Sequence, residues 1–240
     1  MRFRIIGAAL LAIAATTPAP TPAMAADIGQ GFTLSGGPTL VSDYRYRGIS
    51  LSDEGIALQG SLELGHKSGF YAGVWGSSLD DTPLYGDVEF DLYGGWRHDL
   101  RPGTSLDVGF TYYTYPGGDS AVAGDSDYFE PKVAITQQLG PVSGTAGVAW
   151  APSQDSTGKK DNLYVWTGLS APVPGLPLTV KGSVGYSDGA FAPGGHYWDW
   201  SVGVEASSGP IKLGLAYVDT DLGDFRNVDA GLVLSVGASF

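Results

Sequence analysis

The last ten residues of the chain alternate between apolar residues and residues that are mostly small or polar. Successive side chains of a β-strand point to opposite faces, so this segment is predicted to be a strand with one apolar face. That face consists of Leu232, Leu234, Val236, Ala238 and Phe240. Outer-membrane β-barrels are built from such strands, and their final strand typically ends on an aromatic residue. We therefore expect Phe240 to be the signal that the barrel-assembly machinery reads.

The amino-terminal segment has the features of a secretory signal peptide. Two arginines precede an apolar stretch over residues 5–15, and Ala23-Met24-Ala25 forms an A-x-A cleavage site. A membrane-anchoring helix is disfavoured, because the apolar stretch is too short to cross a bilayer and a Pro-rich stretch follows it. We expect residues 1–25 to be removed after export and residues 26–240 to form one domain.

Composition narrows the fold class further. Beyond the signal peptide, no apolar stretch is long enough for a transmembrane helix, so any membrane crossing is predicted to use strands that close on themselves. With 37 Gly, 13 Tyr, 6 Trp and no Cys, the chain is unlike disulfide-rich secreted domains and helical domains. The formal net charge of −12 argues against nucleic acid as a partner. A soluble β-sandwich also fits this composition, so the order of the strands has to decide.

Runs of alternating polarity follow one another along the chain, and most have the length that a tilted membrane strand needs. They lie near residues 33–48, 56–66, 69–78, 86–98, 104–115, 127–138, 142–150, 162–170, 176–186, 197–206, 210–219 and 228–240. Short turns near residues 66–69, 99–103, 139–141, 172–177 and 207–210 alternate with long polar loops near residues 50–55, 79–85, 116–126, 152–161, 187–196 and 220–227. Bacterial barrels have this asymmetry, with short turns toward the periplasm, and a sandwich has no reason for it. The prediction is an all-β fold, a transmembrane antiparallel up-and-down barrel of about 12 strands.

The alternation also assigns the two faces of each strand. A charge that faces lipid near the bilayer midplane costs roughly 2 to 4 kcal/mol, so charged positions are predicted to face the lumen. The predicted lipid-facing residues include Val88, Phe90, Leu92, Trp96, Leu106, Val108, Phe110, Tyr112, Leu178, Val180, Val184, Ile211, Leu213, Leu215 and Tyr217. The candidate pore-lining residues are Asp43, Arg45, Arg47, Glu63, Glu89, Asp91, Arg97, Asp107, Glu130, Lys132, Lys181, Asp199, Glu205 and Lys212.

Aromatic residues gather near the predicted long loops, and fewer lie near the short turns. Two such bands are typical of girdles at the membrane interfaces, with filling of the barrel as the alternative role for some rings. The loop-side group is Tyr44, Tyr46, Trp75, Tyr112, Tyr113, Tyr115, Tyr128, Trp150, Tyr186, Tyr197, Trp198, Trp200 and Tyr217. The turn-side group includes Phe70, Tyr71, Trp96 and Phe240.

The densest motif is Ser42-Asp43-Tyr44-Arg45-Tyr46-Arg47-Gly48. In a strand, Asp43, Arg45 and Arg47 would lie on one face and the two tyrosines on the other. If the tyrosines contact lipid headgroups, the three charged side chains face the lumen. One interpretation is a basic ladder opposite inward carboxylates that sets ion selectivity. The other is a set of internal salt bridges in a filled lumen, because twelve strands lie between small packed barrels and wide porins.

This motif, the downstream Gln59-Gly60-Ser61 and the segment Ser68-Gly69-Phe70-Tyr71-Ala72-Gly73-Val74-Trp75-Gly76-Ser77 also carry a family resemblance. The chain resembles the TorF-like porins of proteobacteria, which have a similar SDYR-x-RG segment followed by QG-S and SGFYAGVWGS. The agreement is strongest over residues 40–78 and continues more loosely through residues 91–96 and 109–113. The resemblance implies a porin-like barrel and says little about a substrate.

Catalytic motifs are scarce. His66 and His98 fall at predicted short turns, where a surface histidine is expected, and His196 lies in a long loop near Asp188 and Asp199. A His/Asp hydrolytic site is conceivable there, but no lipase-type serine motif accompanies it. The phosphate-binding G-x-x-x-x-G-K-[ST] run and the zinc-binding H-E-x-x-H run are both absent from the sequence. We expect no enzyme activity and no metal or other cofactor.

Acidic residues gather in the predicted loops: Asp53, Glu54, Asp80, Asp81, Asp87, Asp119, Asp125, Asp127, Asp155, Asp161, Asp188, Asp219, Asp221 and Asp224. Calcium or magnesium bridging lipopolysaccharide phosphates is one interpretation. Solvation of exposed loops is the simpler one, because no spacing matches a known calcium loop. In both interpretations, the negative loops would concentrate cations at the loop-side opening of the barrel. A basic ladder in the lumen would oppose that preference for cations.

The sequence therefore predicts a channel in the outer membrane of a Gram-negative bacterium, through which small hydrophilic solutes or ions diffuse passively. Its expected partners are outer-membrane lipid and lipopolysaccharide, the barrel-assembly machinery and the solutes. A structural or surface-interaction barrel with a plugged lumen is the alternative, favoured if inward charges pair and aromatic side chains fill the bore. A hydrolase is favoured only if His196 proves essential to an activity.

Overall fold

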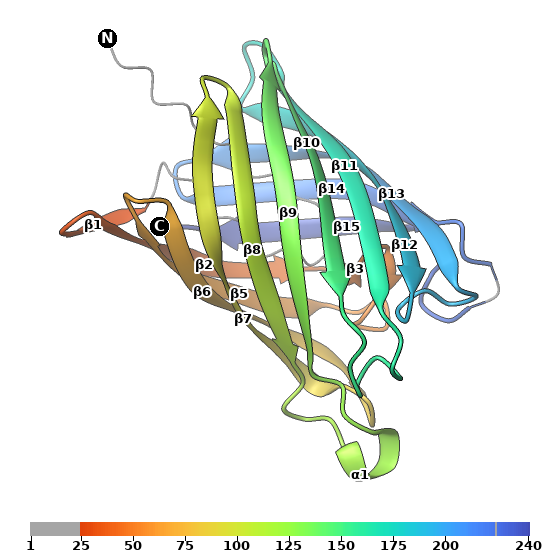
Figure 1. Ribbon diagram of the computed structural model, residues 1–240. Helices are drawn as coiled ribbons and strands as arrows, with labels where there is room; N and C mark the ends of the chain where they lie inside the picture. The colour runs from red at the N-terminus through yellow and green to blue at the C-terminus, as the bar shows by residue number, and fades with distance from the viewer. Residues whose placement is uncertain (1–24, 224) are drawn as a thin grey trace.

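A computed structural model describes residues 25–223 and 225–240 (Figure 1). Residues 1–24 of the predicted signal peptide lie outside the described residues. Within the part of the chain that is described, no helix is both long enough and apolar enough to span a membrane.

Twelve antiparallel strands pair in chain order and close into a barrel, which confirms the predicted fold class (Figure 1). These strands are β2 (Phe32–Val41), β5 (Ala57–His66), β6 (Phe70–Thr82), β7 (Gly86–Arg101), β8 (Thr104–Thr114), β9 (Tyr128–Leu139), β10 (Val142–Ala151), β11 (Asn162–Pro172), β12 (Leu178–Gly189), β13 (His196–Ser208), β14 (Ile211–Thr220) and β15 (Gly231–Ala238). The remaining elements are β1 (Ala26–Gly29), the small hairpin of β3 (Arg45–Tyr46) and β4 (Ile49–Ser50), and α1 (Ser120–Ala123).

The barrel closes where β15 meets β2. Val236 lies opposite Leu40 in this seam, and two backbone hydrogen bonds of 3.0 and 3.2 Å join Phe240 to Gly36. A Cβ on Gly37 would lie 1.8 Å from a carbonyl oxygen of β15, so a residue with a side chain cannot be accommodated there without a shift of the backbone. The amino-terminal half of β2 then pairs with β1, which folds back through a tight turn.

The connections alternate in length as predicted, with one exception. The prediction of a long loop over residues 79–85 is wrong, because β6 continues to Thr82 and β7 begins at Gly86. One end of the barrel, the turn side, carries the short connections, such as residues 67–69 and 102–103, together with the end of the chain at Phe240. The other end, the loop side, carries the long ones, including residues 115–127 with α1 (Figure 1).

Alternation also separates the two faces as the sequence predicted. Large apolar residues such as Leu92, Phe110 and Leu215 are exposed on the outside of the isolated barrel. On the same strands, the charged residues between them are buried or half-buried on the inside. An apolar outer belt around a polar interior is the pattern that a lipid environment requires of a membrane barrel.

The prediction of one strand over residues 33–48 is wrong in its second half. β2 ends at Val41, and residues 42–56, which we call the inward segment, turn into the barrel interior before β5 begins. Arg47 and Gly48 have φ angles of 50° and 85°, and they form the two-residue turn between β3 and β4. Two consecutive positive φ values are what a tight hairpin turn needs and a continuous strand forbids.

Candidate functional site: a constricted barrel interior

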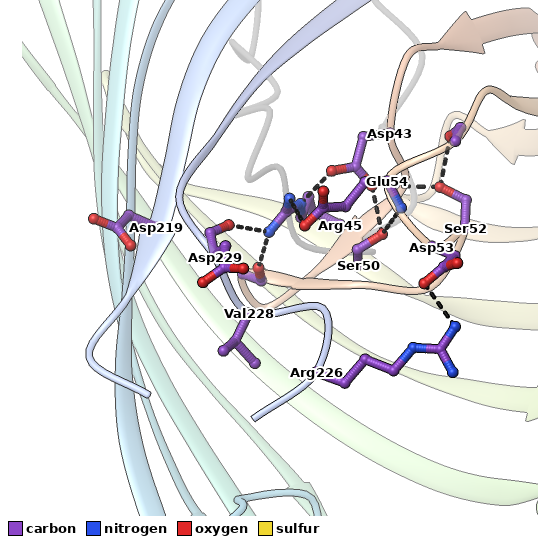
Figure 2. Close-up of polar contacts among 12 residues, drawn as sticks. Asp43, Arg45, Ser50, Ser52, Asp53, Glu54, Asp219, Arg226, Val228 and Asp229 are labelled. Carbon is purple, nitrogen blue, oxygen red and sulfur yellow. Dashed lines mark hydrogen bonds and ion pairs between the residues drawn. The ribbon is translucent and has the colours of Figure 1, made fainter. Parts of the chain in front are cut away.

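The inward segment is held in shape by polar contacts of its own (Figure 2). The carboxylate of Asp43 accepts hydrogen bonds from the guanidinium of Arg45, from the hydroxyl of Ser50 at 2.6 Å and from that of Ser52 at 3.3 Å. The Ser52 hydroxyl in turn accepts the backbone N–H of Tyr44 at 2.8 Å. Because these contacts lie within the segment, they make it a preorganised insert in the barrel.

Arg45 ties the inward segment to the loop between β14 and β15. Its guanidinium donates to the backbone carbonyl of Gly48 at 3.2 Å and to that of Asp229 at 2.7 Å (Figure 2). The side chain is 1% exposed, and its charge is met by Asp43. Arg45 therefore holds the inward segment against the loop between β14 and β15.

Arg47 crosses the interior to the opposite wall. Its Nη2 atom lies 2.6 Å from both carboxylate oxygens of Glu130 on β9, and its guanidinium stacks 4.1 Å from the ring centre of Tyr164 on β11. Its backbone carbonyl accepts the hydroxyl of Tyr197 on β13 at 3.0 Å. Burial by itself lowers the pKa of Arg47, but the carboxylate of Glu130 raises it and the net shift is upward, so the guanidinium stays charged.

The predicted basic ladder is therefore a set of closed ion pairs. Both arginines lie in the interior, as the alternation predicted, but each is neutralised by a carboxylate at hydrogen-bond distance. The two tyrosines of this motif, Tyr44 and Tyr46, also lie inside, because their hydroxyls find polar partners there. Tyr44 donates to Glu89 at 2.9 Å, and Tyr46 is bonded to Tyr128 at 3.1 Å. The expectation that these two tyrosines meet lipid headgroups is wrong.

Carboxylates outnumber cations on the loop side of the interior. Glu89 is completely buried and accepts hydrogen bonds from Tyr44 and from Tyr115, the latter at 3.4 Å. Asp199 accepts one from Tyr164 at 3.2 Å. Burial, followed by the nearby negative charges of Glu89 and Asp91, raises the pKa of Tyr44, so its hydroxyl keeps the proton that it donates.

The turn-side half of the interior is more open. Arg97 lies 2.6 Å from Glu63 and 3.3 Å from Asp107, and its side chain is 35% exposed although it points inward. Lys181 pairs with Glu205 at 3.0 Å. Lys132 and Lys212 are half-buried on the inner faces of β9 and β14. Charged inward side chains with partial exposure indicate that water reaches this half.

Several aromatic residues predicted as interfacial lie inside the barrel. They include Trp75, Tyr113, Tyr115, Tyr128 and Tyr197, all nearly inaccessible to solvent. Tyr113 and Tyr128 stack with ring centres 4.4 Å apart. Tyr112, Trp150, Trp198 and Tyr217 are exposed on the outside, as a girdle requires. Closeness to the long loops does not distinguish the inward aromatic residues from the outward ones. Their place in the alternation along each strand does.

The sequence reasoning missed other interior residues. Tyr93, Tyr164 and Trp166 occupy inward positions of β7 and β11, and Asn162 lies at the loop-side start of β11 with no exposed surface. Tyr164 carries the stacking contact with Arg47. The signal was available, because Tyr164 and Trp166 alternate with the apolar outward residues of the run over 162–170.

The histidines and the acidic loops were the other candidate sites predicted from the sequence. His196 is exposed on β13 beside Tyr186, with ring centres 6.0 Å apart. Among the described residues, no three His, Asp or Glu side chains are placed to hold a metal ion together. At the mouth, Arg226 bridges Asp53 at 2.8 Å (Figure 2). Asp224 lies outside the described residues.

The barrel is similar to solved membrane proteins. The structure described as the NanC porin aligns with a TM-score of 0.56 and 9% identity, over 86% of this chain and 98% of that one. A chain from a study of in-meso crystallisation of membrane proteins aligns with a TM-score of 0.52 and 12% identity, over 86% and 83%. OpdK of Pseudomonas aeruginosa, solved with vanillate, aligns with a TM-score of 0.46 and 14% identity, over 90% and 67%.

The two alignments with TM-scores above 0.5 show a shared fold, the porin-like antiparallel barrel. Comparison with curated protein sequences gave no match. The sequence profile of one family covers residues 25–233. The chain belongs to that family, which is described as "Bacterial protein of unknown function (Gcw_chp)".

Proposed function

We propose that this barrel is a narrow outer-membrane channel through which small hydrophilic solutes or ions diffuse passively. The observation that carries the proposal is the contrast between the two faces of the wall. The outer face is apolar around the barrel, whereas the inner face holds charged side chains that remain partly exposed on the turn side, Arg97 and Asp107 among them. A barrel that only needed stability would gain more from a dry apolar core.

The inward segment sets the width of the channel. It fills part of the loop-side half and leaves the turn-side half, with its Arg97 and Lys181 pairs, partly exposed. Passage therefore runs beside the Arg47–Glu130 bridge, where the segment meets the wall of β9. Only small solutes fit such a constriction.

The porin-like fold and the motif over residues 40–78 support the assignment to TorF-like porins and to the outer membrane of a Gram-negative bacterium. In this proposal a signal peptide over residues 1–25 directs export, and the barrel-assembly machinery reads Phe240. The Phe240 ring is exposed at the turn side, where another protein can reach it. The aromatic residues of the outer face then contact outer-membrane lipid and lipopolysaccharide.

No enzymatic role is proposed. His196 lies on the outer side of the wall beside Tyr186 and Trp198, an environment that suits an interfacial girdle. Tyr186 and Asp188, its nearest polar neighbours along β12, bond to each other at 3.5 Å.

A closed structural barrel is the second candidate, and one observation favours it. Arg45, Arg47 and Arg97 all meet carboxylates, and stacked tyrosines fill part of the bore. In that case the inward segment is a permanent plug, and the loops contact other surface molecules.

Swelling of proteoliposomes separates the two candidates. The refolded chain is reconstituted, and the vesicles are diluted into isosmotic solutions of a monosaccharide, a disaccharide and a trisaccharide. A narrow channel predicts swelling that is fastest with the monosaccharide and falls steeply with size. Vesicles that keep their volume in all three sugars, although the protein is folded, would favour the closed barrel.

A further inference from the structure

Two carboxylates of β7 are buried in the interior without a basic partner. Glu89 and Asp91 occupy successive inward positions and are 0% and 1% exposed. Among the described residues, neither has an arginine or lysine nitrogen within 4.0 Å, whereas Asp43 and Glu130 each bind an arginine of the inward segment. Carboxylates on this wall therefore outnumber the basic groups that pair with them.

Asp91 is the less satisfied of the two. Glu89 accepts hydrogen bonds from Tyr44 and Tyr115, but Oδ1 of Asp91 has no hydrogen-bond partner although it is fully buried. An ionised carboxylate removed from water costs several kcal/mol of free energy unless a positive group or hydrogen bonds compensate it. The described residues offer Oδ1 of Asp91 neither, so the ionised form of this carboxylate needs a partner from outside the chain.

The arginines of the inward segment do not supply it. Arg45 binds Asp43 and the carbonyls of Gly48 and Asp229. Arg47 binds Glu130 through Nη2, and its Nη1 atom, which has no hydrogen-bond partner, is not within 4.0 Å of an Asp91 oxygen. What surrounds Asp91 is aromatic, because its cross-strand neighbours are Trp75 on β6 and Tyr113 on β8. The faces of such rings attract cations as well.

We propose that Glu89 and Asp91 form a binding site for a small hard cation, such as K⁺, Na⁺ or Ca²⁺, at the constriction. Such cations take oxygen ligands, and carboxylates at a constriction select cations. A site with two carboxylates holds an ion more weakly than a closed metal site, and conduction needs weak binding, because a permeating ion has to leave. The selectivity that follows rests on the proposed channel, whereas binding of the ion does not.

Reversal potentials test the selectivity. Wild type, Asp91→Asn and Asp155→Asn are measured in planar bilayers under a KCl gradient, with Asp155 as a control carboxylate in an exposed loop. We expect the reversal potentials of wild type and Asp155→Asn to be shifted toward the K⁺ equilibrium potential. Asp91→Asn is expected to lower the permeability ratio of K⁺ to Cl⁻ several-fold. An unchanged ratio in Asp91→Asn would overturn the role of this site in selectivity.

Stability in different salts tests binding without any current. Urea unfolding in lipid vesicles is followed in KCl, in CaCl₂ and in N-methylglucamine chloride at equal ionic strength. A site predicts a higher unfolding midpoint of wild type in KCl or CaCl₂ than in the bulky organic salt, and loss of that difference in Asp91→Asn. The salt with the larger effect identifies the preferred cation. Equal midpoints of wild type in all three salts would overturn the site, and salt-specific stabilisation of an electrically silent barrel would refute only the channel.

Discussion

Arg47 of the inward segment and Glu130 of β9 form a buried bridge across the barrel interior, with one guanidinium nitrogen 2.6 Å from both carboxylate oxygens. Both side chains are 4% exposed. The bridge joins a segment that follows β2 to a strand on a different part of the wall. It therefore fixes where the inward segment lies and how much of the bore stays free.

Removal of one partner of this bridge should destabilise the protein strongly. Arg47→Met leaves the carboxylate of Glu130 buried without its cation, for which we expect a loss of about 3 to 5 kcal/mol in the free energy of unfolding. The double variant Arg47→Met/Glu130→Leu removes both charges and should recover much of that loss. Urea unfolding in lipid vesicles measures both, and a double variant no more stable than the single one would refute the buried pair as the cause.

Removal of the inward segment should widen the channel. Val41 and Ala57 are cross-strand neighbours, so a short Gly/Ser linker can replace residues 43–55 without disturbing β2 or β5. The expected result is a several-fold larger single-channel conductance. Shortening residues 117–125, the loop that carries α1 outside the barrel, is the matched control and should leave the conductance unchanged (Figure 1). Equal conductance in both deletion variants would show that the constriction lies elsewhere.

Neighbouring residues of β12 should lose different amounts of stability when they are replaced by a charged residue. Val184 is exposed on the outer face, whereas the Ser183 hydroxyl contacts that of Ser201 inside at 2.8 Å. Val184→Lys places a charge in lipid and should cost roughly 2 to 4 kcal/mol of folding free energy. Ser183→Lys, at the same depth, should cost clearly less. Urea titrations of both variants in vesicles make the comparison, and equal losses would contradict the assignment of faces.

The hairpin turn of the inward segment should depend on Gly48. Its φ is +85°, and a Cβ there would lie 2.3 Å from Cγ2 of Thr220. Gly48→Ala should therefore cost about 1 to 2 kcal/mol from the backbone conformation alone, with the clash added. Gly60→Ala is the control, because a Cβ at that position meets nothing within 4 Å. If both variants unfold at the same urea concentration, the turn does not need glycine.

Much of the fold could be predicted because a membrane barrel imposes one simple rule on every strand. Lipid outside and polar groups inside require alternation, so most strand positions, most loop lengths and the faces of the wall strands were visible in the sequence. The inward placement of Glu89, Asp91 and Arg97 followed from that rule.

The interior contacts could not be predicted in the same way, because they join segments that are distant in sequence. The Arg47–Glu130 pair spans 83 positions, and the Tyr197–Arg47 contact spans 150. The motif around Arg45 also alternates like a strand, yet its Arg47-Gly48 turn bends it inward. Tyr44 faces the interior and not the lipid headgroups because its hydroxyl finds a hydrogen-bond partner there, Glu89. This partner lies on another strand and could not be identified from the motif.

The single-channel conductance of residues 26–240, refolded and inserted into a planar lipid bilayer, tests most directly whether the barrel is an open channel. An open channel should give discrete current steps, and their amplitude should be small because the inward segment narrows the bore. Folded barrels that pass no current, both with residues 43–55 and without them, would contradict an open channel and leave a closed structural barrel as the explanation.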